Sequence, residues 1–148
     1  MIKDDLKYFA AQPGAVIFPP TISSEIDSLN AALLLDNFSP VPEEYAAFLK
    51  MNNGMFYDGI ELYGSSSHYR DTKNYKFPEL REINQNYANY NFFTDKLVIG
   101  RCSESLIYYD HRANIYAIAD RINLRSRQEV DDFPALLALL RNLCENNP

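Results

Sequence analysis

The stretch from residue 42 to residue 64 constrains the fold more than any other part of the chain, because it contains a helix with signals at both ends. Pro42 suits the first position of a helix, and the carboxylates of the next two residues favour the positive helix end. Apolar side chains then recur at spacings of three and four residues and form one face, at Tyr45, Phe48 and Leu49. Asn53-Gly54 ends the helix, since glycine readily adopts the left-handed conformation that follows many helices.

A short strand is predicted directly after this helix. The turn-prone pair Asp58-Gly59 precedes residues 60–63, in which apolar and polar side chains alternate. The stretch is therefore expected to contain a helix, a glycine stop, a short loop and a half-buried strand, and to end at Gly64.

The order of these residues resembles the signature of the SUKH superfamily, which includes bacterial immunity proteins and a fungal regulator of cell-wall synthesis. The signature positions are filled here by Pro42, Tyr45, Phe48, Leu49, Asn53, Gly54, Gly59, Tyr63 and Gly64. Many members carry tryptophan in or near the sheet and this chain has none, so the branch of the superfamily stays open. The resemblance extends over residues 22–143. It implies an α+β domain and an immunity protein that binds and neutralises a toxin, often a nuclease.

Hydrophobic spacing predicts four more helices, with expected limits of Ile2 to Pro13, Ser24 to Asp36, residues 79–90, and Asp131 to Leu143. Ser24 and Asp27 form a start that is similar to a capping box, and Asp131 or Asp132 is expected to cap the last helix. The apolar stripe of this last helix should pack on a sheet.

Short β-type runs predict an antiparallel sheet of four strands, at residues 60–63, 97–100, 106–109 and 115–118, with a fifth strand around 124–130 left open. Residues 15–18 are interpreted as a connector rather than an edge strand, and residues 65–76 as a long surface loop. The expected fold is one SUKH-like α+β domain over residues 1–148, with N-terminal helices, an antiparallel sheet of about four to five strands, and a C-terminal helix packed on the sheet.

The charge distribution favours a protein partner over nucleic acid. The formal net charge is −6, and residues 1–64 hold three basic residues against nine acidic ones. An acidic surface repels a phosphate backbone and attracts a basic protein, although many acidic proteins have no charged partner. The N-terminus has no long apolar run, so neither a signal peptide nor a membrane segment is expected.

Catalytic and cofactor sites are not predicted. The two cysteines lack metal-site spacing and are expected to be reduced thiols in the cytoplasm, with a single disulfide as the alternative. Cys102 and His111 fall near opposite ends of one predicted strand, which argues against a catalytic dyad. No glycine-rich phosphate loop or metal-ligand motif occurs, so no catalytic residue, cofactor or metal is expected.

Tyrosine is the residue type that indicates function. The chain has eleven tyrosines, and tyrosine is enriched in protein interfaces because it offers a large apolar face with a polar tip. About half of these tyrosines are expected to be ordinary sheet residues. The predicted partner-binding residues are Tyr57, Asp58, Glu61, Tyr63, His68 and Tyr69.

The favoured function is a non-enzymatic protein-binding domain, and by the resemblance an immunity protein against a basic toxin. The alternative is a regulatory or scaffold module that binds cellular proteins without a toxin. A small enzyme is the third hypothesis, for which the sequence offers little support. The chain is expected to act in the cytoplasm without contacting a membrane, and formation of a homo-oligomer stays open.

Overall fold

The computed structural model describes residues 2–70, 75–124 and 127–145. Within these ranges the α-helices are α1 (Ile2–Ala11), α2 (Ser23–Leu35), α3 (Glu43–Met51), α4 (Leu80–Gln85) and α5 (Phe133–Glu145). A short 3-10 helix, η1 (Asn91–Phe93), follows α4. The five helices lie close to the limits expected from the sequence, with α4 shorter than its hydrophobic spacing indicates.

Seven strands of the described part of the chain form one antiparallel sheet in the order β1-β2-β3-β6-β7-β8-β9. Their bounds are β1 (Val16–Ile17), β2 (Met55–Tyr57), β3 (Ile60–Leu62), β6 (Lys96–Cys102), β7 (Ser105–Asp110), β8 (Ile115–Asp120) and β9 (Arg127–Val130). A separate hairpin consists of β4 (His68–Arg70) and β5 (Tyr75–Phe77). The protein is therefore α+β, with its C-terminal helix packed on an antiparallel sheet.

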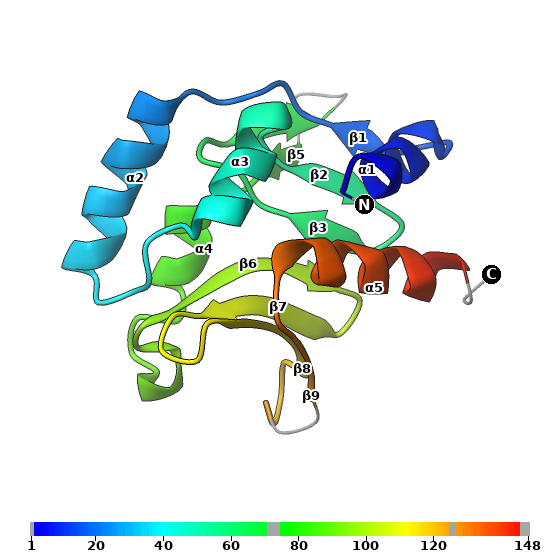
Figure 1. The fold of residues 1–148 in the computed structure, drawn as a ribbon. Helices are drawn as coiled ribbons and strands as arrows, with labels where there is room; N and C mark the ends of the chain where they lie inside the picture. Colours follow the sequence, from blue (N-terminus) through cyan, green and yellow to red (C-terminus); the bar gives the residue numbers. More distant parts are fainter. Residues whose placement is uncertain (1, 71–74, 125–126, 146–148) are drawn as a thin grey trace.

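The two faces of the sheet are covered by different elements (Figure 1). On one face, the Tyr116 ring of β8 packs against Phe133 of α5, with ring centroids 5.8 Å apart. On the other face, Tyr108 of β7 contacts Phe93 of η1. Helices α1, α3 and α5 lie on the first face, whereas α4, η1 and the β4–β5 hairpin lie on the second.

Helix α5 is anchored by its apolar stripe. Phe133, Leu136, Leu137 and Leu140 are fully buried, and burial of each such side chain contributes about 1.5–3 kcal/mol. Asp132 Oδ1 accepts a hydrogen bond from the Ala135 amide at 2.8 Å. The prediction that one of the two aspartates caps this helix is confirmed.

Helices on both faces hydrogen-bond to an irregularity in the middle of β6. The pairing of β6 with β7 shifts register between Val98 and Gly100. From α3, the Tyr45 hydroxyl donates to the Ile99 carbonyl at 3.3 Å and to the Tyr63 carbonyl at 2.5 Å. From α4, the side chain of Asn84 accepts from the Val98 amide at 2.8 Å and donates to the Val98 carbonyl at 2.9 Å. Asn84 thus supplies hydrogen bonds to the Val98 backbone, which lies beyond the end of the β3–β6 pairing at Gly100.

The Asn-Gly pair after α3 has a structural role. Gly54 has φ +109°, a conformation that other residues rarely adopt. A Cβ atom at Gly64 would overlap the backbone carbonyl of Asn53. The Asn53 side chain holds the chain after Gly64, because its Oδ1 accepts from the Ser65 amide at 2.7 Å and its Nδ2 donates to the Ser66 hydroxyl at 3.1 Å.

The sheet has more strands than the sequence predicts. Residues 15–18, interpreted as a connector, contain edge strand β1, which pairs with β2; β2 itself lies in the expected loop. Residues 65–76, interpreted as a long surface loop, contain β4 and part of β5. These strands have two or three residues each, too few to show a hydrophobic period, and they form because neighbouring segments pair with them.

The start of α2 also differs from the prediction. Ile22 is the N-cap residue, and no side chain forms a cap hydrogen bond there. The amides of Glu25 and Ile26 instead donate to the Ile22 carbonyl. Ser24 therefore lies inside the first turn rather than at its cap.

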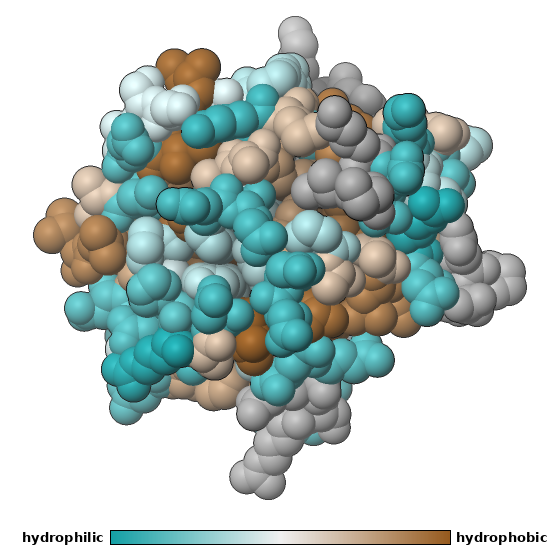
Figure 2. All heavy atoms as spheres, viewed as in Figure 1, coloured by the Kyte–Doolittle hydropathy of each residue, from teal (hydrophilic) through white to brown (hydrophobic). Residues whose placement is uncertain are grey.

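The surface is largely hydrophilic in the view of Figure 2, and its apolar side chains form separate patches. One patch lies at the end of α2, where Leu34 and Leu35 are 58% and 83% exposed. Among the described residues, no helix is both long and apolar enough to span a membrane.

Candidate functional site

The residues that the sequence predicts as one surface are divided between the two faces of the sheet. In the β2–β3 hairpin, Tyr57 pairs with Ile60 and Phe56 pairs with Glu61. Directly paired residues share a face, and successive residues alternate between faces. Tyr57 therefore lies on the α1 side, where its ring contacts Phe9, whereas Glu61 lies on the opposite side. Asp58 occupies the turn between the strands and is exposed.

Glu61 and Tyr63 are buried rather than outward-facing, with 8% and 3% exposure. The Tyr63 hydroxyl donates to Glu61 Oε1 at 2.9 Å. Burial raises the pKa of Tyr63, and the Glu61 carboxylate raises it further, while Arg101 acts in the opposite direction. The expectation that these two side chains face solvent is wrong: the Phe77 ring of β5 packs on the Tyr63 ring with centroids 5.5 Å apart, and the Tyr63 hydroxyl is bonded to Glu61.

His68 lies in a supporting position beside Asn53. Its ring stacks on Phe18 with centroids 4.1 Å apart, and its Nε2 donates to the Asn53 carbonyl at 2.9 Å. These contacts fasten the start of β4 to the turn after α3. The side chain of Tyr69, the remaining predicted contact, lies outside the described part of the structure.

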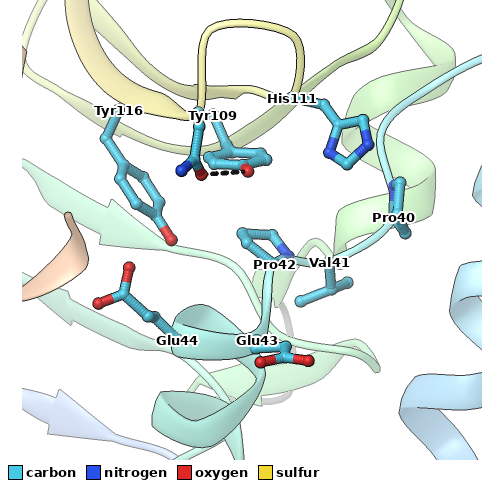
Figure 3. Close-up of a pocket in the computed structure, with 9 residues that line it drawn as sticks. Pro40, Val41, Pro42, Glu43, Glu44, Tyr109, His111 and Tyr116 are labelled. Carbon is cyan, nitrogen blue, oxygen red and sulfur yellow. Dashed lines mark hydrogen bonds between the residues drawn. The ribbon is translucent and has the colours of Figure 1, made fainter. Parts of the chain in front are cut away.

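A different set of residues converges on a cleft of about 380 Å³ between the start of α3 and the β7–β8 hairpin (Figure 3). Its lining combines prolines, tyrosines and acidic side chains, and consists of Pro40, Val41, Pro42, Glu43, Glu44, Tyr109, His111, Asn114 and Tyr116. The volume falls within the range of about 300–1,000 Å³ that is usual for ligand sites.

One wall of the cleft is the connector between α2 and α3. The Ser39 amide donates to the Lys96 carbonyl of β6 at 3.0 Å, and the Val41 amide donates to Asn30 Oδ1 of α2 at 2.8 Å. Pro40 and Pro42 restrict the backbone further, because each fixes its own φ angle. This wall is therefore held rigidly against both a helix and the sheet.

The opposite wall is the turn of the β7–β8 hairpin. The Tyr109 hydroxyl donates to Asn114 Oδ1 at 2.9 Å across the turn, as the dashed line in Figure 3 marks. Asp110 Oδ1 accepts from the backbone amides of Arg112 and Ala113. These bonds fix the Tyr109 ring, whose centroid lies 5.0 Å from that of Tyr116.

The hydroxyl of Tyr116 points into the cleft without a hydrogen-bond partner among the described residues. The residue is only 1% exposed, so its hydroxyl is costly to leave unpaired. In Figure 3 this hydroxyl faces the carboxylate of Glu44. Glu44 is itself positioned, because its Oε1 accepts from the Phe133 amide at the start of α5 at 3.3 Å.

The cleft carries negative charge. Its charged lining residues are Glu43 and Glu44, both exposed. The start of α3 contributes only about half a positive charge, which two carboxylates outweigh. Burial raises the pKa of Tyr116, and Glu44 raises it further; burial also raises the pKa of Tyr109, followed by Asp110 and Glu44. Both phenols therefore stay protonated at neutral pH, and the cleft suits a cationic group.

Sequence reasoning attributed the Glu43-Glu44 pair to helix capping and missed Tyr116. Tyr109 was not predicted as a site residue, because nothing in the sequence distinguishes it from the other tyrosines of the predicted strands. The Pro-Val-Pro segment directly before an acidic pair was the available signal, but the partners of that pair come from a hairpin far along the chain. Packing of α3 and the connector before it on the sheet, which the sequence alone does not determine, brings them together.

The two cysteines lie beside one small cavity. Cys102 and Cys144 are not joined by a disulfide, and they line a small cavity of about 40 Å³ with Asp58. Burial raises the pKa of Cys102, and Asp58 raises it further, so the thiol stays protonated and is a weak nucleophile. Within the described ranges, no group of three or more His, Cys, Asp and Glu side chains could hold a metal ion.

Compared with known proteins, the sequence matches no protein-family model, and no curated protein is similar enough to count as a match.

Proposed function

We propose that this chain is a non-enzymatic immunity protein of the SUKH type, which acts in the cytoplasm and neutralises a basic toxin domain by binding to it. The observation that carries the proposal is the cleft between α3 and the β7–β8 hairpin, where two carboxylates, two tyrosine rings and an unpaired buried hydroxyl converge. The net charge of −6 adds long-range attraction toward a basic partner. The assignment to immunity comes from the resemblance of residues 42–64 to the superfamily signature.

Charge alone is too weak to explain such binding. An ion pair with an exposed carboxylate contributes about 0–1 kcal/mol, because water screens it. A cation over an aromatic ring contributes about 0.5–2 kcal/mol. The tyrosines therefore matter at least as much as the glutamates, and the cleft is suited to be the centre of a larger interface of roughly 1,600 Å².

Asp58, Tyr57 and His68 remain proposed partner contacts away from the cleft, because Asp58 lies beside the β6–β7 turn, at the opposite end of β7 from the β7–β8 turn. Asp58 is exposed, and the other two are partly exposed. Glu61 and Tyr63 support this region from the interior and are not proposed to touch the partner.

The mechanism is occlusion, and it predicts stoichiometric neutralisation. The toxins encoded next to this gene would be expressed one at a time with the chain, and growth and complex formation would be recorded. A cognate toxin should be inhibited at a ratio of about one to one, because each bound chain covers one toxin. Toxin recovered from the complex by denaturation and refolding should have an unchanged mass and full activity.

Three outcomes would contradict the proposal. Neutralisation at strongly substoichiometric amounts, or a covalently altered toxin, would indicate an enzyme. Failure to protect against, or to bind, any neighbouring toxin would reject the immunity function. Stable binding to a cellular protein in that case would support the regulatory or scaffold alternative.

A further inference from the structure

Three kinds of group face the same part of the cleft. The rings of Tyr109 and Tyr116 form an aromatic wall, with centroids 5.0 Å apart and planes inclined at 52°. The carboxylate of Glu44 lies opposite the Tyr116 hydroxyl (Figure 3). Both Glu44 and Tyr116 are anchored to α5, Glu44 through the Phe133 amide and Tyr116 through the Phe133 ring.

We infer that this cleft holds an arginine side chain of the partner, with its guanidinium group against the tyrosine rings and hydrogen-bonded to Glu44 and the Tyr116 hydroxyl. The inference rests on the proposed function, in that a basic protein supplies the arginine. It goes further by naming the recognised group and the residues that recognise it.

The charge of the cleft selects a cation. Glu43 and Glu44 are its charged lining residues, and no lysine or arginine stands among the described residues that line it. Two cations of the elements beside the cleft are paired: Lys96 Nζ lies 3.9 Å from Asp110 Oδ2, and Arg112 Nε lies 2.7 Å from Asp95 Oδ2. An anionic group would therefore meet two carboxylates, and His111 would be the basic side chain that faces it among the described lining residues.

The shape and the available acceptors select a guanidinium over an ammonium group. A guanidinium is planar, so it can stack on a tyrosine ring while its edge donates to a carboxylate. Glu44 uses Oε1 for the Phe133 amide and leaves Oε2 available, and the Tyr116 oxygen can accept a second donor. A guanidinium offers donors to both at once, whereas an ammonium group is a compact point charge that is more strongly hydrated.

The site is preorganised, which lowers the entropic cost of binding. The Tyr109 ring is fixed by Asn114, the proline wall by Asn30, and Glu44 by the α5 backbone. The unpaired hydroxyl of Tyr116 makes the binding free energy more favourable, because a buried polar group is stabilised when it receives a hydrogen-bond partner.

The test uses the full chain without any partner protein. N-acetyl-arginine amide is titrated into the isotope-labelled protein up to about 100 mM, a range that detects the millimolar affinity expected of a single side chain. Parallel titrations use the lysine analogue and the citrulline analogue, which keeps the shape of arginine and lacks its charge. Chemical-shift changes should concentrate on Tyr109, Asn114 and Tyr116, and binding of both analogues should be about tenfold weaker.

Two variants identify the recognising groups, and a third is the control. Glu44→Gln keeps an oxygen for the Phe133 amide, and Tyr116→Phe keeps the ring, so both should fold normally while binding the arginine probe about fivefold to tenfold more weakly. Asp27→Asn on the exposed surface of α2 removes one negative charge outside the cleft and should leave binding unchanged. Circular dichroism and amide spectra of each variant confirm the fold.

Several results would overturn the inference. These are shifts outside the cleft, citrulline or lysine analogues that bind as well as arginine, absence of saturable shifts, or an Asp27→Asn effect equal to that of Glu44→Gln. The two proposals fail separately. A toxin that binds the chain while the arginine probe does not would reject only this inference, whereas arginine binding without any toxin partner would reject only the immunity function.

Discussion

Two buried tyrosines that touch the same phenylalanine have different roles at the scale of single residues. The rings of Tyr45 and Tyr116 both pack on Phe133, at 5.3 and 5.8 Å. The Tyr45 hydroxyl donates to two backbone carbonyls at the β6 irregularity, whereas the Tyr116 hydroxyl has no partner among the described residues. The first hydroxyl therefore stabilises the fold, and the second, buried at the wall of the cleft, is the one proposed to bind the partner's arginine.

Replacement of each tyrosine by phenylalanine should separate these roles. Tyr45→Phe should lower the free energy of unfolding by about 1–2 kcal/mol, because a buried hydrogen bond is lost and its acceptors remain. Tyr116→Phe should instead raise it by up to about 1–3 kcal/mol, since it removes a buried hydroxyl that has no hydrogen-bond partner among the described residues. Urea denaturation followed by circular dichroism measures both values. An equal loss of stability in the two variants would show that the Tyr116 hydroxyl has a structural partner, contrary to the present account.

At the scale of elements, the sequence predicted those with a long hydrophobic period and missed those that depend on pairing. The leucine stripe of α5 and the apolar runs of β6, β7 and β8 placed these elements correctly. Strands β1 and β2 were missed because they are too short to show alternation. That omission also affected the predicted site: without the β2–β3 hairpin, Tyr57 and Glu61 looked like neighbours on one surface. The cleft depends on a helix start and a distant hairpin, whose proximity no local pattern encodes.

Asn84 gives an element-level prediction, because its side chain joins α4 to the β6 edge. Asn84→Ala should destabilise the protein by about 2–4 kcal/mol, since it removes the partners of the Val98 amide and carbonyl in a buried site. Hydrogen exchange at the Val98 amide should accelerate in the same variant. Gln85→Ala, at an exposed position of the same helix, is the matched control and should have little effect. If the two variants have equal stability, another group forms the hydrogen bonds to the Val98 amide and carbonyl.

At the scale of the whole molecule, the negative charge and the cleft act at different distances. In the proposed complex, the net charge of −6 attracts the basic partner from afar and mainly raises the association rate, an effect that salt weakens. The cleft acts only after contact, and mainly lowers the dissociation rate. The two contributions can therefore be separated by variants with the same net charge.

The most direct test of the central claim compares two double variants in binding to the cognate toxin. Glu43→Gln/Glu44→Gln changes the cleft, and Asp4→Asn/Asp27→Asn removes the same charge from exposed positions on α1 and α2. Dissociation constants and rates would be measured by surface plasmon resonance at low and high salt. The cleft variant should bind at least about tenfold more weakly, mainly through faster dissociation, and the control should change the association rate by about twofold or less. Equal weakening by both variants, or unchanged binding by the cleft variant, would contradict the central claim.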